Sequence, residues 1–470
     1  MSVTLDQRDL LTSQYCQIPP DKASYSLSMI ESLLIKQVQI ITPFGKKDGD
    51  ILIKNGKIHA MDWKLPDHAQ VIIKDRGLTL MPGVIDPHVH FREPGATWKE
   101  TLESGSKAAV AGGVTSFFDM PNTKPSATTR ETIAEKKRIA KETSLANYNF
   151  FIGATTDNLD ELKAIENVPG IKIFVGSSTG TLLVDQEDDL RKIFTETSAI
   201  ISVHSEKESI IKANKDIYKD STNPLDHPRI RSVEAAVQCT KMLLQLAHDT
   251  KRRLHICHLT TEEEMQMIAK ARKDTPVTTE VSPQHLFLYG PDIYQKIGNF
   301  AVINPPIREK RHADALWQGL KSGVIDCIAT DHAPHTIEEK LQDYSKAPSG
   351  MPGVETSLQL MLNMVAQKRC TMSDIVRWMC EAPAKIYGIP YKGAIQIGYD
   401  ADLVLVDLNA KRTIQSDKQH TMCKWSAFDG WETQGAPIAT MVNGRLAYRE
   451  GEFFTASKGQ EIRIRKPAPR

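Results

Sequence analysis

Two histidines separated by one residue, His88 and His90, have the spacing in this chain that most suggests chemistry. They follow an apolar run at 81–86, and in a β-strand residues i and i+2 point to the same face, so both imidazoles would lie together at a strand end. Such a pair could begin a metal site, and Arg92, two residues further on, could bind an anion on the same rim. A bare pair of this kind is more often two unrelated surface histidines, so its partners elsewhere in the chain decide its role.

Composition narrows the classes of protein to consider. The chain has 470 residues, which suits a barrel with an accessory domain. Charged residues make up 25% and the formal net charge is +1, so neither nucleic acid nor an anionic membrane is expected as a partner. The seven cysteines are scattered and form no C-x-x-C, so no disulfide framework or cysteine-zinc site is predicted. Neither a signal peptide nor an apolar run of about 18 residues is recognised, so we expect a soluble cytoplasmic protein.

Short apolar runs alternate with helix-like intervals through the middle of the chain. Intervals such as 129–143 and 262–272 have the pattern of amphipathic helices. Eight β–α alternations favour an α/β fold of the (β/α)8 TIM-barrel type over an open doubly wound sheet. The eight apolar runs lie at 84–90, 114–120, 148–154, 171–175, 200–204, 254–258, 277–281 and 325–330.

Both ends of the chain carry β-type runs that are interrupted by Asn-Gly, a strong hairpin signal. One pair is Asn55-Gly56 and the other is Asn443-Gly444. We therefore expect one small composite β-sandwich domain built from both termini. The predicted division is an N-terminal extension of unknown role at 1–30, the β-domain at 31–82 plus 392–460, the barrel at 83–391 and a C-terminal tail at 461–470.

Residue types that bind metals occur at five of the eight predicted strand ends. In this barrel class the chemistry gathers at the carboxyl ends of the strands. Chance placement of the whole set is improbable, and Asp331 would be a ligand or a base, although it could also cap a helix. The set consists of His88, His90, Lys172, His204, His258 and Asp331.

Two further histidines are interpreted as structural. Residues i and i+3 of a strand face opposite sides, so only one of His255 and His258 should enter the site. His258 lies nearer the strand end, and His255 is expected to pack beneath the helices. His285 is also expected to be structural.

Lys172 lies within an apolar strand, where a charged lysine is costly. An ammonium group has no lone pair with which to bind metal, but a neutral amine can add carbon dioxide and become a carbamate that bridges two metal ions. A lysine that extends to the rim is an equally good interpretation on physical grounds alone.

Taken together, these residues resemble the amidohydrolase superfamily and, within it, the dihydroorotases. The resemblance runs from about residue 82 to 353 and is carried by DPHVHFREPG at 86–95, DMPNT at 119–123, HICH at 255–258, NPPIR at 304–308 and DHAPH at 331–335. It implies a barrel with a composite β-sandwich and a binuclear centre of two Zn²⁺ bridged by carboxylated Lys172 and hydroxide. The six strand-end residues would be the ligands. Some bacterial members have an aspartate at the position of Lys172, so this chain resembles the lysine-bridged branch, which favours the carbamate.

The same resemblance implies the substrate contacts. Arg92 and Asn122 would hold a substrate carboxylate, since the planar guanidinium matches that geometry. Asn304 and His335 would complete the pocket, and the loop with Ser349 and Gly350 would offer backbone groups to the ring.

The implied reaction is the reversible cyclisation of N-carbamoyl-L-aspartate to L-dihydroorotate in pyrimidine synthesis, with Asp331 moving the proton. Hydantoinases, dihydropyrimidinases and allantoinases share the metal ligands and remain alternatives. A non-catalytic scaffold for aspartate transcarbamoylase is another, less favoured because all six ligand positions are filled. The partner is expected to be a small-molecule substrate. Homo-oligomerisation, association with other pyrimidine enzymes and the identity of the metal stay open at the level of sequence.

Overall fold

The computed structural model describes residues 16–17, 31–75, 77–177 and 182–465. Within the predicted N-terminal extension, it describes the short strand β1 (Cys16–Gln17), which pairs antiparallel with β5 (Val71–Lys74). The rest of the extension lies outside the described residues.

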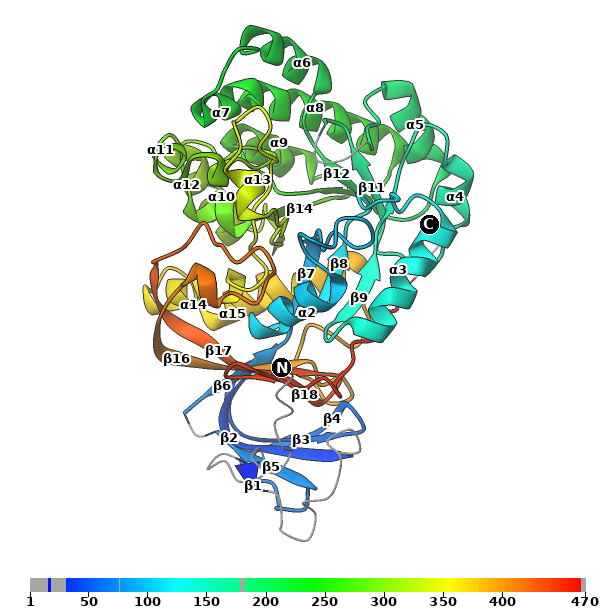
Figure 1. The fold of residues 1–470 in the computed structure, drawn as a ribbon. Coiled ribbons are helices and arrows are strands. Elements are labelled where there is room, and N and C mark those ends of the chain that lie inside the picture. Colours follow the sequence, from blue (N-terminus) through cyan, green and yellow to red (C-terminus); the bar gives the residue numbers. More distant parts are fainter. Residues whose placement is uncertain (1–15, 18–30, 76, 178–181, 466–470) are drawn as a thin grey trace.

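The central part of the described chain is a parallel barrel, as predicted (Figure 1). The third predicted strand appears as β9 and β10, which are separated by Phe151 alone. The barrel closes where Val89 forms a parallel bridge with His332, and the His90 amide donates to the His332 carbonyl at 2.8 Å. Its strands are β7 (Val84–Val89), β8 (Val114–Asp119), β9 (Asn147–Phe150), β10 (Ile152–Gly153), β11 (Ile171–Phe174), β12 (Ile201–His204), β13 (Leu254–Ile256), β14 (Val277–Val281) and β15 (Cys327–Ile328).

Helices surround the barrel, and several of them begin at capping side chains. The two helices predicted from periodicity appear as α3 (Arg130–Thr143) and α9 (Glu262–Ala271). The hydroxyls of Thr129 and Thr261 accept hydrogen bonds from amides in the first turn, which is why each helix starts there. Other helices on the barrel are α2 (Leu102–Ala111), α4 (Leu159–Ala164), α5 (Glu187–Glu196), α6 (Glu208–Ile217), α7 (His227–Ile230), α8 (Val233–Thr250), α10 (Pro283–Phe287), α11 (Asp292–Ile297), α12 (Lys310–Ser322), α13 (Ile337–Lys340), α14 (Ser357–Ala366), α15 (Met372–Val376) and α16 (Ala382–Tyr387).

Strands from both ends of the chain form one mixed sheet beside the barrel (Figure 1). The two ends meet where β6 pairs antiparallel with β16, with Leu80 opposite Leu405, and both side chains belong to a buried aliphatic core. The composite β-structure is therefore confirmed. The larger strands of this sheet are β2 (Ser32–Thr42), β3 (Gly45–Lys54), β4 (Lys57–Asp62), β6 (Thr79–Pro82), β16 (Leu403–Thr413), β17 (Glu432–Val442) and β18 (Arg445–Arg449), and a short strand β19 (Glu452–Phe453) follows.

The two Asn-Gly turns lie against each other in this sheet. Asn55 and Gly56 have φ of 49° and 74°, and Asn443 and Gly444 have φ of 52° and 75°, as expected for tight hairpins. A Cβ on Gly444 would lie 2.6 Å from the Gly56 Cα. Glycine is therefore needed both for the turn conformation and for the approach of the two backbones.

The segment after β19 returns to the barrel. The amide of Tyr148 in β9 donates to the Gln460 carbonyl at 3.0 Å, and the Ile462 amide donates to the Tyr148 carbonyl at 2.8 Å. Ile462 is buried in a cluster with Ile85 and Phe118. The described part of the predicted tail is thus packed onto the barrel.

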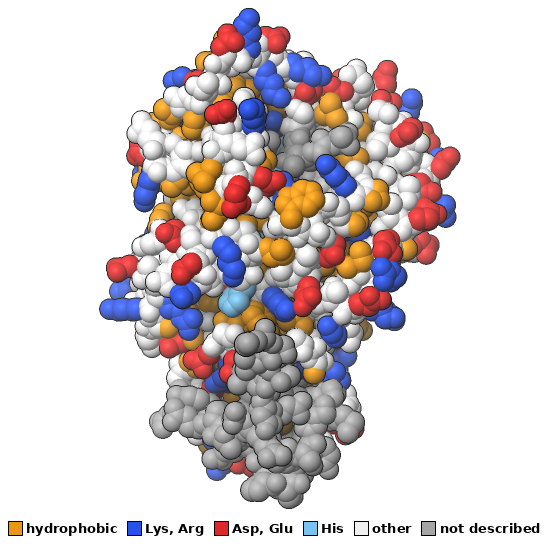
Figure 2. Space-filling view, in the orientation of Figure 1, with side chains coloured by type: hydrophobic (Ala, Val, Ile, Leu, Met, Phe, Trp, Pro, Cys, Tyr) orange, Lys and Arg blue, Asp and Glu red, His pale blue; other side chains and the backbone are white. Residues whose placement is uncertain are grey.

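The molecular surface carries charges of both signs, in agreement with the formal net charge of +1. On the face shown in Figure 2, basic and acidic side chains are intermixed over the barrel. Among the described residues, no helix is long and apolar enough to cross a bilayer.

A buried ion pair fixes the carboxyl end of β8. Lys136 Nζ lies 2.5 Å from Asp119 Oδ2 and donates to the Met120 carbonyl at 2.9 Å, while the Phe91 amide donates to Asp119 Oδ1 at 2.7 Å.

Lys136→Met would leave the buried carboxylate without its cation, so the free energy of unfolding should fall by about 3–5 kcal/mol in urea titrations. Lys310→Met, which removes an exposed pair with Asp314, is the control and should cost less than about 1 kcal/mol. Equal losses in the two variants would contradict a special role for the buried pair.

Candidate metal centre

The carboxyl end of the barrel holds a pocket that brings most of the predicted site residues together. Five of the six predicted metal ligands line it, as do the predicted substrate residues other than His335. The lining residues are His88, His90, Arg92, Asn122, Phe174, His204, His258, Asn304, Asp331, Ala333, Ser349 and Gly350. Residues from six strand ends and two further loops therefore converge at one position.

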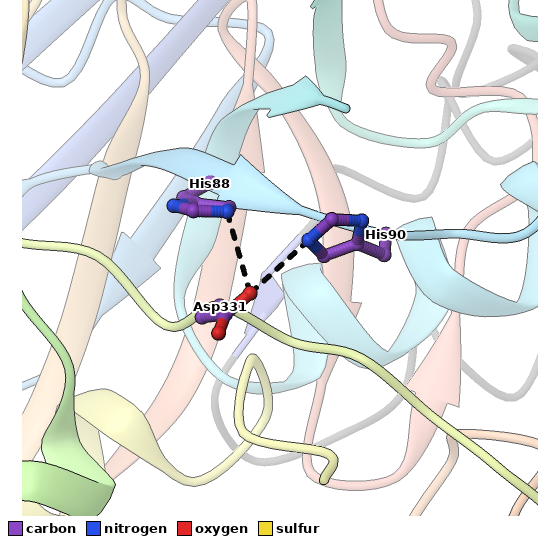
Figure 3. Close-up of side chains that lie close together, drawn as sticks. All are labelled: His88, His90 and Asp331. Atoms are coloured by element: carbon purple, nitrogen blue, oxygen red, sulfur yellow. Dashed lines mark hydrogen bonds and ion pairs between the residues drawn. The ribbon is translucent and has the colours of Figure 1, made fainter. Parts of the chain in front are cut away.

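The first group consists of His88, His90 and Asp331, whose side chains point toward one another (Figure 3). Asp331 Oδ1 lies 3.3 Å from His88 Nε2 and 3.1 Å from His90 Nε2. Because both histidines come from the end of β7 and Asp331 follows β15, the closure of the barrel itself brings them together.

Hydrogen-bond acceptors behind the imidazoles orient this first group. His88 Nδ1 lies 2.5 Å from Glu280 Oε1, and His90 Nδ1 lies 2.7 Å from Asn122 Oδ1. An acceptor at Nδ1 favours the tautomer with its proton there, which leaves the Nε2 lone pair facing Asp331. Two lone pairs and a carboxylate oxygen that point at one place suit a cation.

The second group consists of His204 and His258. His204 Nδ1 lies 3.1 Å from His258 Nε2, and His204 Nε2 lies 2.8 Å from Glu206 Oε2. The Glu206 carboxylate is also held by Arg231. Because Glu206 Oε2 accepts a hydrogen bond from the protonated Nε2, the Nδ1 lone pair of His204 faces His258, which is again an arrangement suited to a cation.

Burial keeps these groups in the protonation states that metals require. It lowers the pKa of His90 to about 4 and lowers the pKa of His258 and of His204 as well, so these imidazoles are neutral near pH 7. Burial alone would raise the pKa of Asp331, but His88 and His90 hold it below its usual value. His90, His204 and His258 are therefore available as neutral donors beside an ionised carboxylate.

Lys172 lies within reach of both groups. Its side chain is 0% exposed, and its Nζ lies 3.0 Å from Cys257 Sγ. That sulfur lies within 4.8 Å of a ring nitrogen of His88 and belongs to the residue before His258, so the amine lies close to both groups. The alternative in which this lysine extends to the rim does not fit a fully buried side chain.

Three site residues adopt left-handed backbone conformations. Arg92 has φ of 60°, His258 of 33° and Asp331 of 46°. Such a conformation costs a non-glycine residue roughly 1–2 kcal/mol, and such residues cluster at functional sites because the surrounding structure holds them there. Here the turn redirects each side chain as its strand ends.

Arg92 is a buried cation on the rim of the pocket. It is 5% exposed, its Nε donates to the Pro334 carbonyl at 3.2 Å, and its Nη2 lies 3.1 Å from His335 Nε2. Among the residues that the structure describes, no carboxylate forms an ion pair with it. Burial lowers its pKa to about 10, so the guanidinium stays charged at neutral pH and suits an anionic ligand.

The remaining predicted substrate residues lie in or behind the wall of the same pocket. His335 Nε2 lies 3.0 Å from the Ser349 carbonyl and His335 Nδ1 lies 2.9 Å from Lys99 Nζ, so this histidine lies behind the pocket wall. The Asn304 Oδ1 is held 3.0 Å from His227 Nε2. The predicted side chains thus belong to one pocket, and His335 contacts Arg92 directly.

The residues interpreted as structural are buried and do not line this pocket. His285 contacts Ser282 Oγ at 2.6 Å and the Pro305 carbonyl at 3.0 Å. His255 Nε2 lies 3.0 Å from Glu280 Oε2, so His255 shares a carboxylate with His88. The expectation that His255 only packs beneath the helices was therefore incomplete.

Sequence reasoning missed Glu280 and Glu206, the carboxylates behind His88 and His204. Burial would raise the pKa of Glu280, but His88 and His255 hold it well below its usual value. Burial would also raise the pKa of Glu206, but Arg231 and His204 hold that pKa below its usual value. A glutamate inside the apolar run 277–281, and another two residues after His204, were the available signals.

A barrel with imidazole and carboxylate donors at the carboxyl ends of its strands is typical of metal-dependent hydrolases. The sequence profile of the amidohydrolase family matches residues 79–447. The chain therefore belongs to the amidohydrolase family.

Similar proteins fall into two groups. A dihydroorotase from Methanosarcina acetivorans is 34% identical over 449 residues, which cover 90% of this chain and 95% of the relative. A dihydroorotase from Pyrococcus horikoshii is 35% identical over 416 residues, with 88% and 92% covered. Among solved structures, an L-hydantoinase (dihydropyrimidinase) from Arthrobacter aurescens has a TM-score of 0.88 at 30% identity and covers 93% of this chain and 100% of its own.

We predict that Glu280→Gln weakens metal binding by about 10–100-fold, because the carboxylate that orients His88 is lost. Competition with a chelator, read by metal analysis, measures this directly. The control is Glu264→Gln, since Glu264 is a buried glutamate that bonds Thr240 and Thr261 instead. Unchanged metal affinity in Glu280→Gln would show that His88 does not need this partner.

Proposed function

We propose that this chain is a dihydroorotase, which interconverts N-carbamoyl-L-aspartate and L-dihydroorotate. The observation that carries the proposal is Arg92, a buried guanidinium without a carboxylate partner among the described residues, on the rim of a pocket lined by metal-binding donors. A substrate carboxylate would supply the missing anion. The names of the curated relatives support the same activity.

The donor set supports a binuclear zinc centre. His88, His90 and Asp331 would hold one ion and His204 and His258 the other, with carboxylated Lys172 between them. Bound in this way, two metal ions supply a hydroxide at neutral pH and polarise the ring carbonyl.

The side chains of the chain itself would position the substrate and move the proton. Arg92 and Asn122 would hold the carboxylate, while Asn304, His335 and the backbone at Ser349 and Gly350 would surround the ring. Asp331 would accept the proton of the attacking hydroxide and return it to the leaving nitrogen. Fixing the substrate in a reactive geometry contributes to the rate in its own right.

A related cyclic amidase is the second candidate, and the similarity to a hydantoinase structure supports it. The predicted metal ligands do not distinguish a dihydroorotase from such an amidase. Arg92 favours the dihydroorotase, because its substrate carries a carboxylate. A catalytically inactive scaffold is less favoured, since all six predicted ligand positions are filled.

Turnover of dihydroorotate, hydantoin, dihydrouracil and allantoin by the metal-loaded chain tests the proposal. We expect the highest kcat/KM for dihydroorotate, because Arg92 pairs with its carboxylate. A higher kcat/KM for any other compound would overturn the choice of substrate. Metal-loaded protein that turns over none of them would favour the scaffold.

Arg92→Met should raise KM for dihydroorotate by about 10–100-fold, as expected for the loss of hydrogen bonds to a charged group. Metal content should stay at the wild-type level, because Arg92 is not expected to bind metal. Arg311→Met, which changes an exposed arginine of α12, is the control. Loss of metal from Arg92→Met would contradict the assignment.

Lys172→Ala should abolish activity and lower metal content, since the bridging group would be missing. Short carboxylic acids such as acetate should restore part of the activity by supplying two oxygens in its place. The same acids should not raise the activity of the wild-type chain. A fully active Lys172→Ala variant would rule out the bridging role.

A further inference from the structure

Lys340 is a buried lysine beside the substrate pocket that the proposed chemistry leaves unused. It is the last residue of α13 and is 1% exposed. The helix begins directly after His335, where Thr336 and Glu339 form a capping box. A buried lysine is costly unless its ammonium is fully hydrogen-bonded, so its partners indicate its role.

The ammonium of Lys340 donates to three backbone carbonyls from two separate segments. These are Val302 at 3.2 Å, Pro348 at 2.9 Å and Gly350 at 3.1 Å. Val302 precedes Asn304 by two residues, and Pro348 and Gly350 flank Ser349. We call residues 302–304 the Asn304 segment and residues 347–350 the Ser349 loop.

Both of these segments supply part of the pocket lining. Asn304 comes from one, and Ser349 and Gly350 come from the other. A single backbone hydrogen bond, from the Gly350 amide to the Val302 carbonyl at 2.9 Å, also joins them. All three ammonium hydrogens of Lys340 are thus used to hold the two segments at a fixed spacing.

The charges that face Lys340 also connect it with the ligand. Burial lowers the pKa of Lys340 to about 7, the charges of Arg92 and Lys99 act in the same direction, and Glu339 opposes them. His335, which contacts both Arg92 and Lys99, stays neutral because its pKa is held well below its usual value by burial and by Arg92. An anion bound at Arg92 would offset this excess of positive charge and favour the ammonium form.

We propose that Lys340 is a positioning residue for substrate, which holds the Ser349 loop against the Asn304 segment so that both contact the ring at once. This role rests on the proposed function of the pocket. Lys340 does not itself reach the reacting atoms and lines no part of the pocket. Its loss should therefore affect substrate binding before it affects metal binding.

The test compares Lys340→Met with the wild-type chain, both loaded with metal. We expect KM to rise at least about tenfold while kcat changes less than about threefold and metal content is unchanged, since a misplaced pocket wall weakens binding. Lys340→Arg, which keeps a cation and several donors, should restore part of the loss in KM. The control is Lys392→Met, which breaks buried ion pairs with Asp400 and Asp402 on the β-sheet side and should lower stability without changing KM.

Hydrogen exchange gives an independent readout that does not need turnover. The Gly350 amide should exchange faster in Lys340→Met than in the wild-type chain, while amides of β16 and β17 keep their protection. Unchanged KM together with unchanged Gly350 exchange would overturn the proposal. Equal losses in KM, kcat and metal content would do the same, because they would indicate a purely structural role.

The design separates this proposal from the proposed function. Should the wild-type chain prefer another of the four cyclic amides, that compound becomes the substrate for the comparison. The preference of the wild-type chain then reports on the proposed function, and the ratio between variant and wild type reports on Lys340.

Discussion

The rest of the structure depends on the burial of ionisable side chains at one end of a barrel. Removing such groups from water is expensive unless they are neutral, paired or bound to metal. Three imidazoles, those of His90, His204 and His258, meet this constraint by staying neutral. The carboxylates of Glu280 and Glu206 meet it by staying close to histidines and Arg231. What remains is a set of lone pairs and one carboxylate directed at a common space, and a cation there would complete the electrostatic balance.

The carboxylates behind the imidazoles determine the orientation of the metal-binding donors. Glu280 links His88 to His255, and Glu206 links His204 to Arg231. Each carboxylate fixes which nitrogen of an imidazole carries the proton, and thereby which nitrogen faces the pocket. The cationic side, with Arg92, Lys99 and Lys340, is separate from this shell, so metal binding and substrate binding can be disturbed independently.

Much of the fold could be predicted because its signals are local. Apolar runs that alternate with helix-like intervals predicted the barrel, and the Asn-Gly pairs predicted turns that the structure confirms at Gly56 and Gly444. The strand-end histidines could be recognised because each of them lies at or near the end of an apolar run in the sequence. Glu280, Glu206 and Lys340 could not, since a glutamate in a strand or a lysine at a helix end resembles an ordinary surface residue until distant segments meet. The shared carboxylate of His88 and His255, for example, joins residues that are 192 and 25 positions from it.

If the two groups of donors hold metal ions that the chemistry needs, turnover must follow the metal content of the chain. The most direct measurement is the number of metal ions bound per chain, followed together with turnover as metal is removed by a chelator and then returned. The account predicts two ions per chain in the active protein, with turnover lost on removal and recovered on return. Full turnover of a chain from which all metal has been removed would contradict it.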